Sequence, residues 1–189
     1  MPKPPLLPTT PWAKVFESGK EYSRWLDSGE SPDNRRAMEK IRQSLVLEPD
    51  AVSSLQALAR PVSVVAIAED WCGDVVRHVP VLQKMADTSS NLRVRYIRRD
   101  QWPEVFVRFL TNGGEAIPKF VFLNEAFVEC GNWGPMPDAC REVIARGKAC
   151  GNIPAARRKV SAMYDADPNL RAVVTELLHL IDIAACNSP

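Results

Sequence analysis

The feature that most constrains this chain is the segment PVSVVAIA at residues 61–68, which is short, apolar and rich in β-branched side chains. Such a run is typical of a strand buried on both faces, in a sheet that helices cover on each side. A helical pattern follows from Cys72 to about Asp87, with Val75 and Val79 on its inner face. This succession of a buried strand and a helix predicts an α/β fold.

The following segments continue the alternation. The pattern predicts a strand, a helix, a strand with its hairpin partner, and a helix, at residues 91–99, 101–110, 119–123, 125–133 and 136–149. A tight turn at Asn124 and Glu125 should join the last two strands, which are then antiparallel, whereas the helical crossovers imply a parallel pair. Pro80 interrupts the first helix and predicts a kink there.

Helical patterns also flank this core. Residues 1–60 predict a helical N-terminal extension, residues 61–150 the α/β core, and residues 151–189 a C-terminal helical extension. The first eleven residues contain five prolines and predict an extended arm. The last helical pattern, over residues 168–185, carries a strongly apolar stripe that either caps the core or meets a partner, which allows an oligomer.

Composition and charge limit the expected partners. The formal net charge is only +1, so we expect neither nucleic acid nor a membrane surface as a partner. No apolar run approaches the ~20 residues of a membrane helix, and the first residues lack the apolar centre of a signal peptide. We therefore expect a cytoplasmic protein. Its five cysteines match no common zinc spacing, so we expect mostly free thiols, no metal and no cofactor.

Three motifs follow one another in this predicted order. They are DWCGDV at residues 70–75, RRDQWPEV at residues 98–105 and AIPKFVFLN at residues 116–124. The first resembles the Trp-Cys-Gly-Pro-Cys loop of thioredoxin, the second its Asp-x-Asn-Pro segment, and the third its Ile-Pro-Thr segment. The chain thus resembles the thioredoxin-like superfamily over about residues 60–150. The resemblance implies a three-layer α/β/α sandwich with a mixed central sheet, and a cis peptide bond before Pro118.

A narrower resemblance comes from EDWCGDV at residues 69–75 and NWGPMPDA at residues 132–139. These segments resemble a bacterial subgroup of thioredoxin-like proteins that carries Trp-Cys-Gly-Asp and Trp-Gly-Pro-x-Pro. Little about substrates comes with that subgroup.

Three departures from thioredoxin concern its chemistry. Val75 replaces the second cysteine, and Asp74 replaces the proline between the two cysteines. The buried aspartate that assists proton transfer in thioredoxin corresponds to Ala66 in an alignment on Cys72. A reductase that uses two cysteines is therefore disfavoured, because a fold alone does not carry its function.

Cys72 remains the candidate nucleophile. We expect it at the N-cap of the helix, where backbone N–H groups and the helix dipole favour a thiolate. The Asp74 carboxylate in the first turn opposes that thiolate, and it either stabilises the helix or relays a proton in place of the missing aspartate. His78 lies four residues beyond Asp74, so it either pairs with Asp74 at the surface or supports the thiolate, and Arg77 has similar alternatives.

The resemblance also implies a groove for an extended substrate beside this cysteine. Its expected residues are Trp71, Gly73, Ile117, Pro118 and Trp133. The backbone near Pro118 would pair with the substrate as an added strand, although without the resemblance Pro118 is simply a strand-entry proline. The two tryptophans would form apolar walls, with core packing as the alternative for each.

Two hypotheses from different classes follow. The first is a monothiol thiol–disulfide oxidoreductase, in which Cys72 forms a mixed disulfide with a protein thiol or disulfide, or with glutathione, and an external thiol resolves it. The second is a non-catalytic binding module for a peptide or protein. Internal resolution would require Cys130 or Cys186. A peroxidase lacks its Pro-x-x-x-Thr-x-x-Cys surround, and a metal site at Cys72 lacks a clear third ligand.

Overall fold

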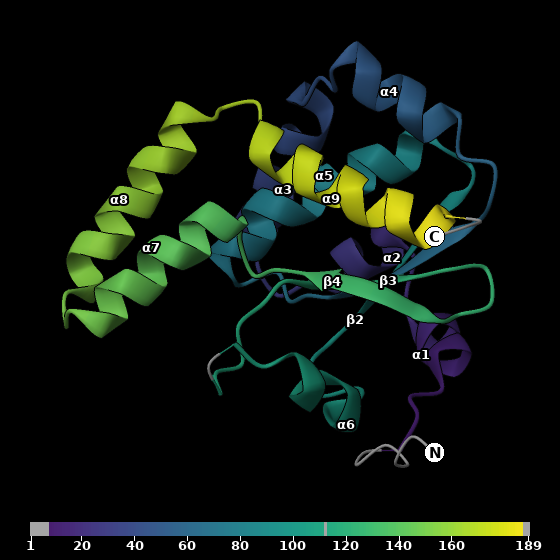
Figure 1. Ribbon diagram of the computed structural model, residues 1–189, viewed down its shortest axis with the longest axis horizontal. Helices are drawn as coiled ribbons and strands as arrows, with labels where there is room; N and C mark the ends of the chain where they lie inside the picture. Colours follow the sequence, from purple (N-terminus) through teal and green to yellow (C-terminus); the bar gives the residue numbers. More distant parts are fainter. Residues whose placement is uncertain (1–7, 112, 187–189) are drawn as a thin grey trace.

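A mixed four-stranded sheet lies at the centre of the computed structural model, which describes residues 8–111 and 113–186 (Figure 1). Its strands are β1 (Val62–Ile67), β2 (Leu92–Ile97), β3 (Lys119–Leu123) and β4 (Glu129–Trp133). They are ordered β2-β1-β3-β4, with β1 parallel to β2 and β3 antiparallel to both of its neighbours. Most of the predicted proline-rich arm, residues 1–7, lies outside the described residues.

Helices cover both faces of this sheet, as predicted. Every residue of β1 and β3 is buried, which agrees with their largely apolar sequences. One face is covered by α5 (Gly73–Thr88) and α9 (Arg171–Ala185), and the other by α1 (Trp12–Ser18) and α6 (Pro103–Phe106) (Figure 1). The predicted three-layer α/β/α sandwich is therefore confirmed.

The helix after β1 contains the predicted proline. Val75, Val79 and Leu82 of α5 are fully buried, and Pro80 lies inside the helix without ending it. The helix predicted over residues 101–110 is shorter than expected: α6 has four residues and a 3₁₀ turn, Val107–Phe109, follows it. The extended backbone of Leu110 then ends the helical segment.

The connection between β3 and β4 also differs from its prediction. Instead of a tight two-residue turn, it runs from Asn124 to Val128, and the Asn124 side chain accepts hydrogen bonds from the backbone N–H groups of Ala126 and Val128. Phe127 adopts a positive φ of 57°, and its ring packs against Phe16 at a centroid distance of 5.6 Å. The longer loop brings this aromatic side chain onto the core.

The described residues before the sheet, from residue 8 on, form four helices. After α1 come α2 (Tyr22–Asp27), α3 (Pro32–Ser44) and α4 (Pro49–Gln56). Lys20, between α1 and α2, forms an antiparallel bridge with Tyr96 at the β2 edge of the sheet. The predicted serine cap of α3 is present, since the Ser31 hydroxyl accepts a hydrogen bond from the backbone N–H of Asn34.

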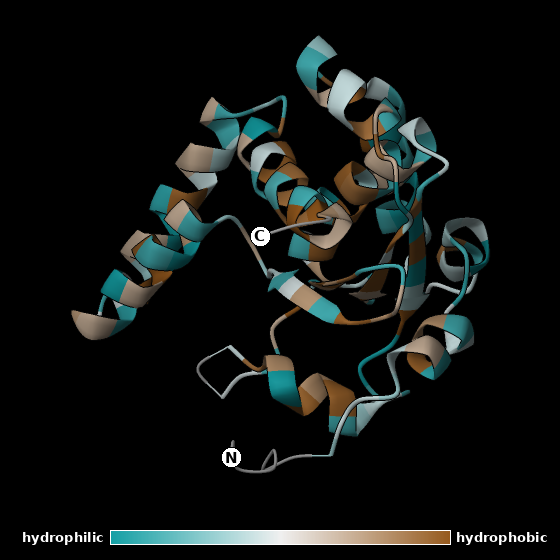
Figure 2. Cartoon of the chain, turned by 45° about the vertical axis from the view of Figure 1, so that its right-hand side comes forward, coloured by the Kyte–Doolittle hydropathy of each residue, from teal (hydrophilic) through white to brown (hydrophobic). Residues whose placement is uncertain are grey.

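Up to residue 186, three helices follow the sheet, and the first two form a hairpin at the side of the molecule. They are α7 (Asp138–Ala149) and α8 (Ile153–Ala166), and hydrophilic residues occur along both (Figures 1 and 2). The last helix, α9, buries Val173, Leu177 and Ile181 almost completely. The apolar stripe predicted near the C-terminus therefore caps the core of the same chain.

One hydrophobic cluster connects all three predicted parts of the chain. It includes buried residues from Trp12 to Ala184, so helices from both extensions contribute to the core around the sheet. The predicted boundaries at residues 60 and 150 separate segments of different sequence pattern, but the hydrophobic packing is continuous across both of them.

Candidate functional site

Cys72 lies at the point where β1 passes into α5. It is the N-cap residue of α5, and its half-buried sulfur is 3.4 Å from the carbonyl oxygen of Ile117, to which the thiol donates a hydrogen bond. The Ile117–Pro118 peptide bond is cis, which confirms the expectation from the sequence. Two segments separated by 45 residues thus meet at the sulfur atom.

Burial decides the protonation of this thiol. It raises the pKa of Cys72, and this effect outweighs the backbone N–H groups of Val75 and Asp74, which act in the opposite direction. The Asp74 carboxylate raises the pKa of Cys72 further, while Arg99 lowers it. The sequence predicts opposing effects of helix and carboxylate at this position. The structure adds the loss of solvation, which makes the thiol the resting form.

Asp74 belongs to a hydrogen-bonded group that extends into the core. The Tyr164 hydroxyl is 3.1 Å from Oδ1 of Asp74 and 3.3 Å from Nε2 of His78, whereas His78 and Asp74 are 4.0 Å apart. Burial raises the pKa of Asp74, although the Tyr164 hydrogen bond and the Arg77 charge act to lower it. The predicted pair of Asp74 and His78 is therefore bridged by a tyrosine of α8.

His78 and Arg77 do not have the positions expected from the sequence. A surface position for His78 is wrong, because its side chain is fully buried, and burial lowers its pKa to about 3. The ring is therefore neutral and does not supply positive charge to a thiolate. The Arg77 guanidinium lies 4.3 Å over the Tyr164 ring and donates to the Tyr164 carbonyl at 2.8 Å, so it binds α8.

The residues just before Cys72 are held by buried polar contacts. Glu69 is buried and accepts hydrogen bonds from Trp71 Nε1 at 2.8 Å and from three nitrogen atoms of Arg99 at 3.1–3.2 Å. Burial alone would raise the pKa of Glu69, but these hydrogen bonds outweigh it and lower the pKa. The Arg99 guanidinium also lies 5.1 Å over the Trp71 ring. The ring, in the residue next to Cys72, remains half exposed.

Asp70 connects the cysteine loop to the N-terminal helices. Its carboxylate is buried and accepts a hydrogen bond from the Ser31 backbone at 2.7 Å, while its carbonyl accepts one from the Asn34 side chain at 2.9 Å. A Cβ atom at Gly29 would overlap the Asp70 carboxylate, so the close approach requires glycine there. The N-terminal extension therefore holds the loop before Cys72, whereas the C-terminal extension contacts the first turn of α5 through Tyr164.

A matching family model settles the relation of this chain to known proteins. The model for the family described as thioredoxin matches residues 19–150, about two thirds of the chain. The chain belongs to the thioredoxin family. The match begins within the N-terminal helices and includes the cysteine loop, the segment before Pro118 and α7.

Solved structures of the thioredoxin family fold include two that are similar over most of this chain. A protein of unknown function from Pseudomonas aeruginosa has 20% sequence identity and a TM-score of 0.71, and an HIV epitope scaffold has 18% identity and a TM-score of 0.69. Each comparison covers 92% of this chain and 98% of the other. A search of curated protein sequences gives no match. These similarities support the fold.

The expected groove of the thioredoxin family is only partly present. Gly73 is exposed with open space around it, and Trp71 is half exposed, whereas the side chains of Ile117 and Pro118 are buried. Trp133 is a correction: it is 2% exposed, stacks on Phe120 at 5.2 Å and donates to Glu176 at 2.6 Å. Of its two alternatives, core packing holds, because β4 pairs Trp133 with Phe120 beneath α9.

The segment after Trp133 is buried and packs against Pro118, next to the cysteine site. The Gly134–Pro135 bond is also cis, and Gly134 has a φ of 116° with its α-carbon so close to Pro118 that an added Cβ would overlap the Pro118 carbonyl. The buried Lys119 donates to the Gly134 carbonyl at 2.6 Å, and burial lowers the pKa of Lys119 to about 8. In the sequence, the Trp-Gly-Pro motif at residues 133–135 is the signal that points to this segment.

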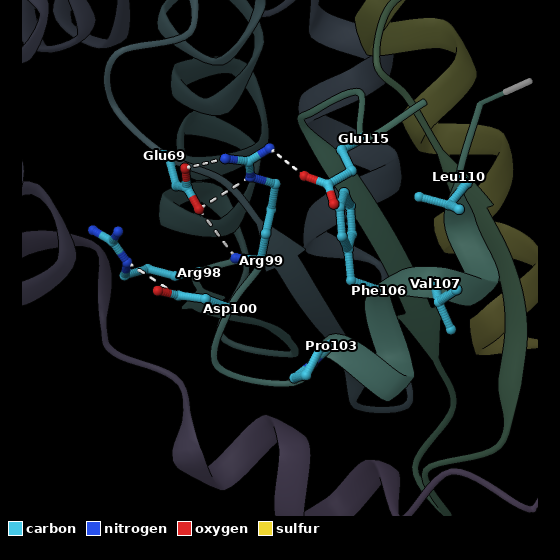
Figure 3. Close-up of a pocket in the computed structure, with 9 residues that line it drawn as sticks. All are labelled: Glu69, Arg98, Arg99, Asp100, Pro103, Phe106, Val107, Leu110 and Glu115. Atoms are coloured by element: carbon cyan, nitrogen blue, oxygen red, sulfur yellow. Dashed lines mark hydrogen bonds and ion pairs between the residues drawn. The ribbon is translucent and has the colours of Figure 1, made fainter. Parts of the chain in front are cut away.

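A cavity of about 470 Å³ opens beside Glu69 and Arg99, which both contact Trp71 (Figure 3). It is lined by charged residues and by an apolar wall, namely Glu69, Arg98, Arg99, Asp100, Glu115, Pro103, Phe106, Val107 and Leu110. Arg99 bridges Glu69 and Glu115 across it, with a distance of 2.9 Å to Glu115 (Figure 3). Sequence reasoning missed this cavity, because its charged residues come from three separate segments.

Cys130, the nearest candidate in the sequence to resolve Cys72, lies too far from it. Cys130 is the second residue of β4, so it lies near Leu123, at the end of β3 that is away from Pro118. At about 3.3 Å per residue, the four steps from Lys119 to Leu123 span about 13 Å, which exceeds the roughly 7 Å limit between the α-carbons of a disulfide. Cys140 is buried in α7, where burial and the carboxylates of Glu176 and Asp74 raise its pKa.

Cys186 lies at the end of α9, which leads away from the site. Glu176 contacts Trp133 near the cysteine loop, and Leu180, one turn later, packs beside Gly131. The helix therefore runs toward the other end of β4 before it reaches Cys186.

Two further site types are not found. Across residues 8–111 and 113–186, no three His, Cys, Asp or Glu residues gather in a way that could hold a metal ion. None of the helices in that same part of the chain has the length and apolar character to cross a membrane.

Proposed function

We propose that Cys72 carries out thiol–disulfide exchange as a lone thiol. The observation that carries this proposal is the position of its sulfur, at the N-terminus of α5 and 3.4 Å from the Ile117 carbonyl. The backbone N–H groups of Asp74 and Val75 act on this sulfur in the direction that stabilises a thiolate. The exposed Trp71 ring and the open space around Gly73 leave one side accessible to a partner.

The exchange has two balanced steps. The Cys72 thiol loses its proton, for which Asp74 is the nearby candidate acceptor, and the thiolate attacks one sulfur of a disulfide R–S–S–R′, which releases R′–S⁻. An external thiolate R″–S⁻ then attacks the mixed disulfide and releases the Cys72 thiolate together with R–S–S–R″. Position 75, where thioredoxin has its second cysteine, is a valine without a thiol, so the second step needs an external thiol.

The raised pKa of Cys72 determines the rates that we expect. Few sulfurs are ionised at neutral pH, so attack is slow, and a thiol of high pKa is also a poor leaving group. The mixed disulfide on Cys72 is therefore long-lived until an external thiol arrives. We propose protein disulfides and glutathione disulfide as partners, in the reducing cytoplasm.

A second function, a binding module without turnover, is favoured by one observation. The resting thiol donates its hydrogen to Ile117, and in that state it is a small polar group on a surface dominated by the Trp71 ring. Such a surface would hold a peptide without a covalent step.

The two functions separate when the reduced protein is incubated with oxidised glutathione and the modified peptide is identified by mass. Exchange predicts a glutathione adduct on Cys72 that added thiol removes, with the exposed Cys150 as internal reference and Cys72→Ser as control. Modification of Cys72 that occurs only after unfolding would overturn the exchange proposal and leave the binding module.

A further inference from the structure

A tyrosine from the C-terminal extension contacts the first turn of the helix that carries Cys72. The Tyr164 hydroxyl has one hydrogen, which it donates to the Asp74 carboxylate at 3.1 Å. The same oxygen is then the acceptor for His78 Nε2 at 3.3 Å. The three groups form a chain that leads from the core to a carboxylate two residues from Cys72.

The buried imidazole fixes the direction of this chain. His78 is fully buried, and its Nδ1 has no hydrogen-bond partner in the part of the chain that the structure describes. A neutral ring carries one hydrogen, and the hydrogen on Nε2 gives that nitrogen a donor role toward Tyr164. The hydroxyl of Tyr164 therefore has its own hydrogen available for Asp74 only.

Tyr164 is itself held in two ways. The Arg77 guanidinium lies over its ring at 4.3 Å and donates to its carbonyl at 2.8 Å and to the Asp167 carbonyl at 3.4 Å. The His78 ring packs edge-on against it at a centroid distance of 5.5 Å. The end of α8 is thus fixed on α5, although the rest of α8 packs mainly on α7 (Figure 1).

From these contacts we propose that Tyr164 is a positioning residue for the chemistry of Cys72, acting through the Asp74 carboxylate, and that α8 thereby regulates the thiol. This role of Tyr164 rests on the proposed exchange function of Cys72. Asp74 opposes ionisation of Cys72, so whatever fixes the charge and orientation of this carboxylate also sets the reactivity of the sulfur.

Several other groups face this pair and belong to the same electrostatic balance. On Asp74 and Cys72 they act from α5, from α7 and from the segment after β2, and they are Arg77, His78, Cys140 and Arg99. Arg77 favours ionised Asp74, and Arg99 favours ionised Cys72. To these charges Tyr164 adds a hydrogen bond that it donates directly to the Asp74 carboxylate.

The proposal is tested with four forms of the full chain: wild type, Tyr164→Phe, Asp74→Asn and the double variant. Tyr164→Phe keeps the ring on Arg77 and removes only the hydroxyl. The titration midpoint of the Asp74 carboxyl is followed by NMR, and the ionisation of Cys72 by its alkylation rate with iodoacetamide against pH. Ser161→Ala, which removes an exposed hydroxyl of the same helix, is the matched control.

We expect the Asp74 midpoint to rise by about half to one pH unit in Tyr164→Phe, because one hydrogen bond to the charged form is lost. Asp74→Asn should lower the Cys72 midpoint, and Tyr164→Phe should change the Cys72 profile only when Asp74 is present. Ser161→Ala should change neither.

Two results would overturn the proposal. The first is an Asp74 midpoint that Tyr164→Phe leaves unchanged. The second is a shift of the Cys72 midpoint by Tyr164→Phe that is equally large in the Asp74→Asn background. If Tyr164→Phe unfolds, the comparison of wild type with Asp74→Asn decides whether the carboxylate acts on Cys72 at all. Iodoacetamide needs no disulfide partner, so failure of the exchange function with glutathione remains a separate result.

Discussion

Replacement of Glu69 by glutamine should destabilise the protein by removing one charge from a buried pair. Glu69 has 5% of its side chain exposed and accepts hydrogen bonds from three nitrogens of Arg99 and from Trp71. Breaking a buried ion pair costs about 3–5 kcal/mol. The Arg99 side chain is 26% exposed and keeps its contact with Glu115, so solvent and that contact recover part of the loss.

We therefore expect Glu69→Gln to lower the free energy of unfolding by about 2–3 kcal/mol. For a chain of this length that corresponds to a decrease in Tm of about 5–10 °C. The matched control is Glu115→Gln, because Glu115 contacts the same guanidinium at 2.9 Å but is 66% exposed. Its loss should cost no more than about 0.5 kcal/mol, as for other exposed pairs.

The pH dependence gives a second check on the same argument. The pKa of Glu69 is lower in the folded protein, so its contribution is fully present above its unfolded pKa of about 4.3 and is lost as the pH falls through the folded pKa. The difference between wild type and Glu69→Gln in urea unfolding should then shrink in acid. A cost equal to that of Glu115→Gln, or a difference that persists unchanged at about pH 2, would refute the reasoning.

Two other predictions test the surroundings of the site. Gly134→Ala should destabilise the protein by about 2 kcal/mol or more, because Gly134 has a φ of 116° and an added Cβ would overlap the Pro118 carbonyl. Gly73→Ala, with open space around it, is the control and should cost less than about 1 kcal/mol in the same urea unfolding experiment. Similar costs for the two variants would contradict the close approach of Gly134 to Pro118. His78 is neutral in the folded protein, with a pKa of about 3, so the free energy of unfolding of the wild type should fall by up to about 1.4 kcal/mol per pH unit as the pH is lowered from 6.5 to 3. An equal pH dependence of the free energy of unfolding in His78→Gln would contradict the burial of this ring.

The sequence predicts well those parts of the site that depend on local patterns. The apolar run of β1 followed by a helical stripe places Cys72 at a helix N-terminus. The position of Ile117 and Pro118 beside it comes from the resemblance to thioredoxin, and the structure agrees with it. These contacts follow from strand pairing, because β1 and β3 are neighbours in the sheet.

Contacts made by distant segments are not visible in such patterns. His78 has the spacing of a surface partner for Asp74, but Tyr164, 90 residues beyond Asp74, covers it. Trp133 fits a groove as well as a core until the position of α9 is known. The direction of the Cys72 pKa likewise depends on burial, which one segment alone does not determine.

The hydrogen bond between Asp74 and Tyr164 has a consequence for the protein during its synthesis. Ninety residues separate the two partners, so at about 5–20 residues per second the ribosome needs roughly 5–20 s to make Tyr164 after Asp74. The bond from Ser31 to Asp70 spans 39 residues in the other direction, and both of its partners are already made when Cys72 is added. A nascent chain thus presents its cysteine loop anchored on the N-terminal side while the second anchor is still being translated.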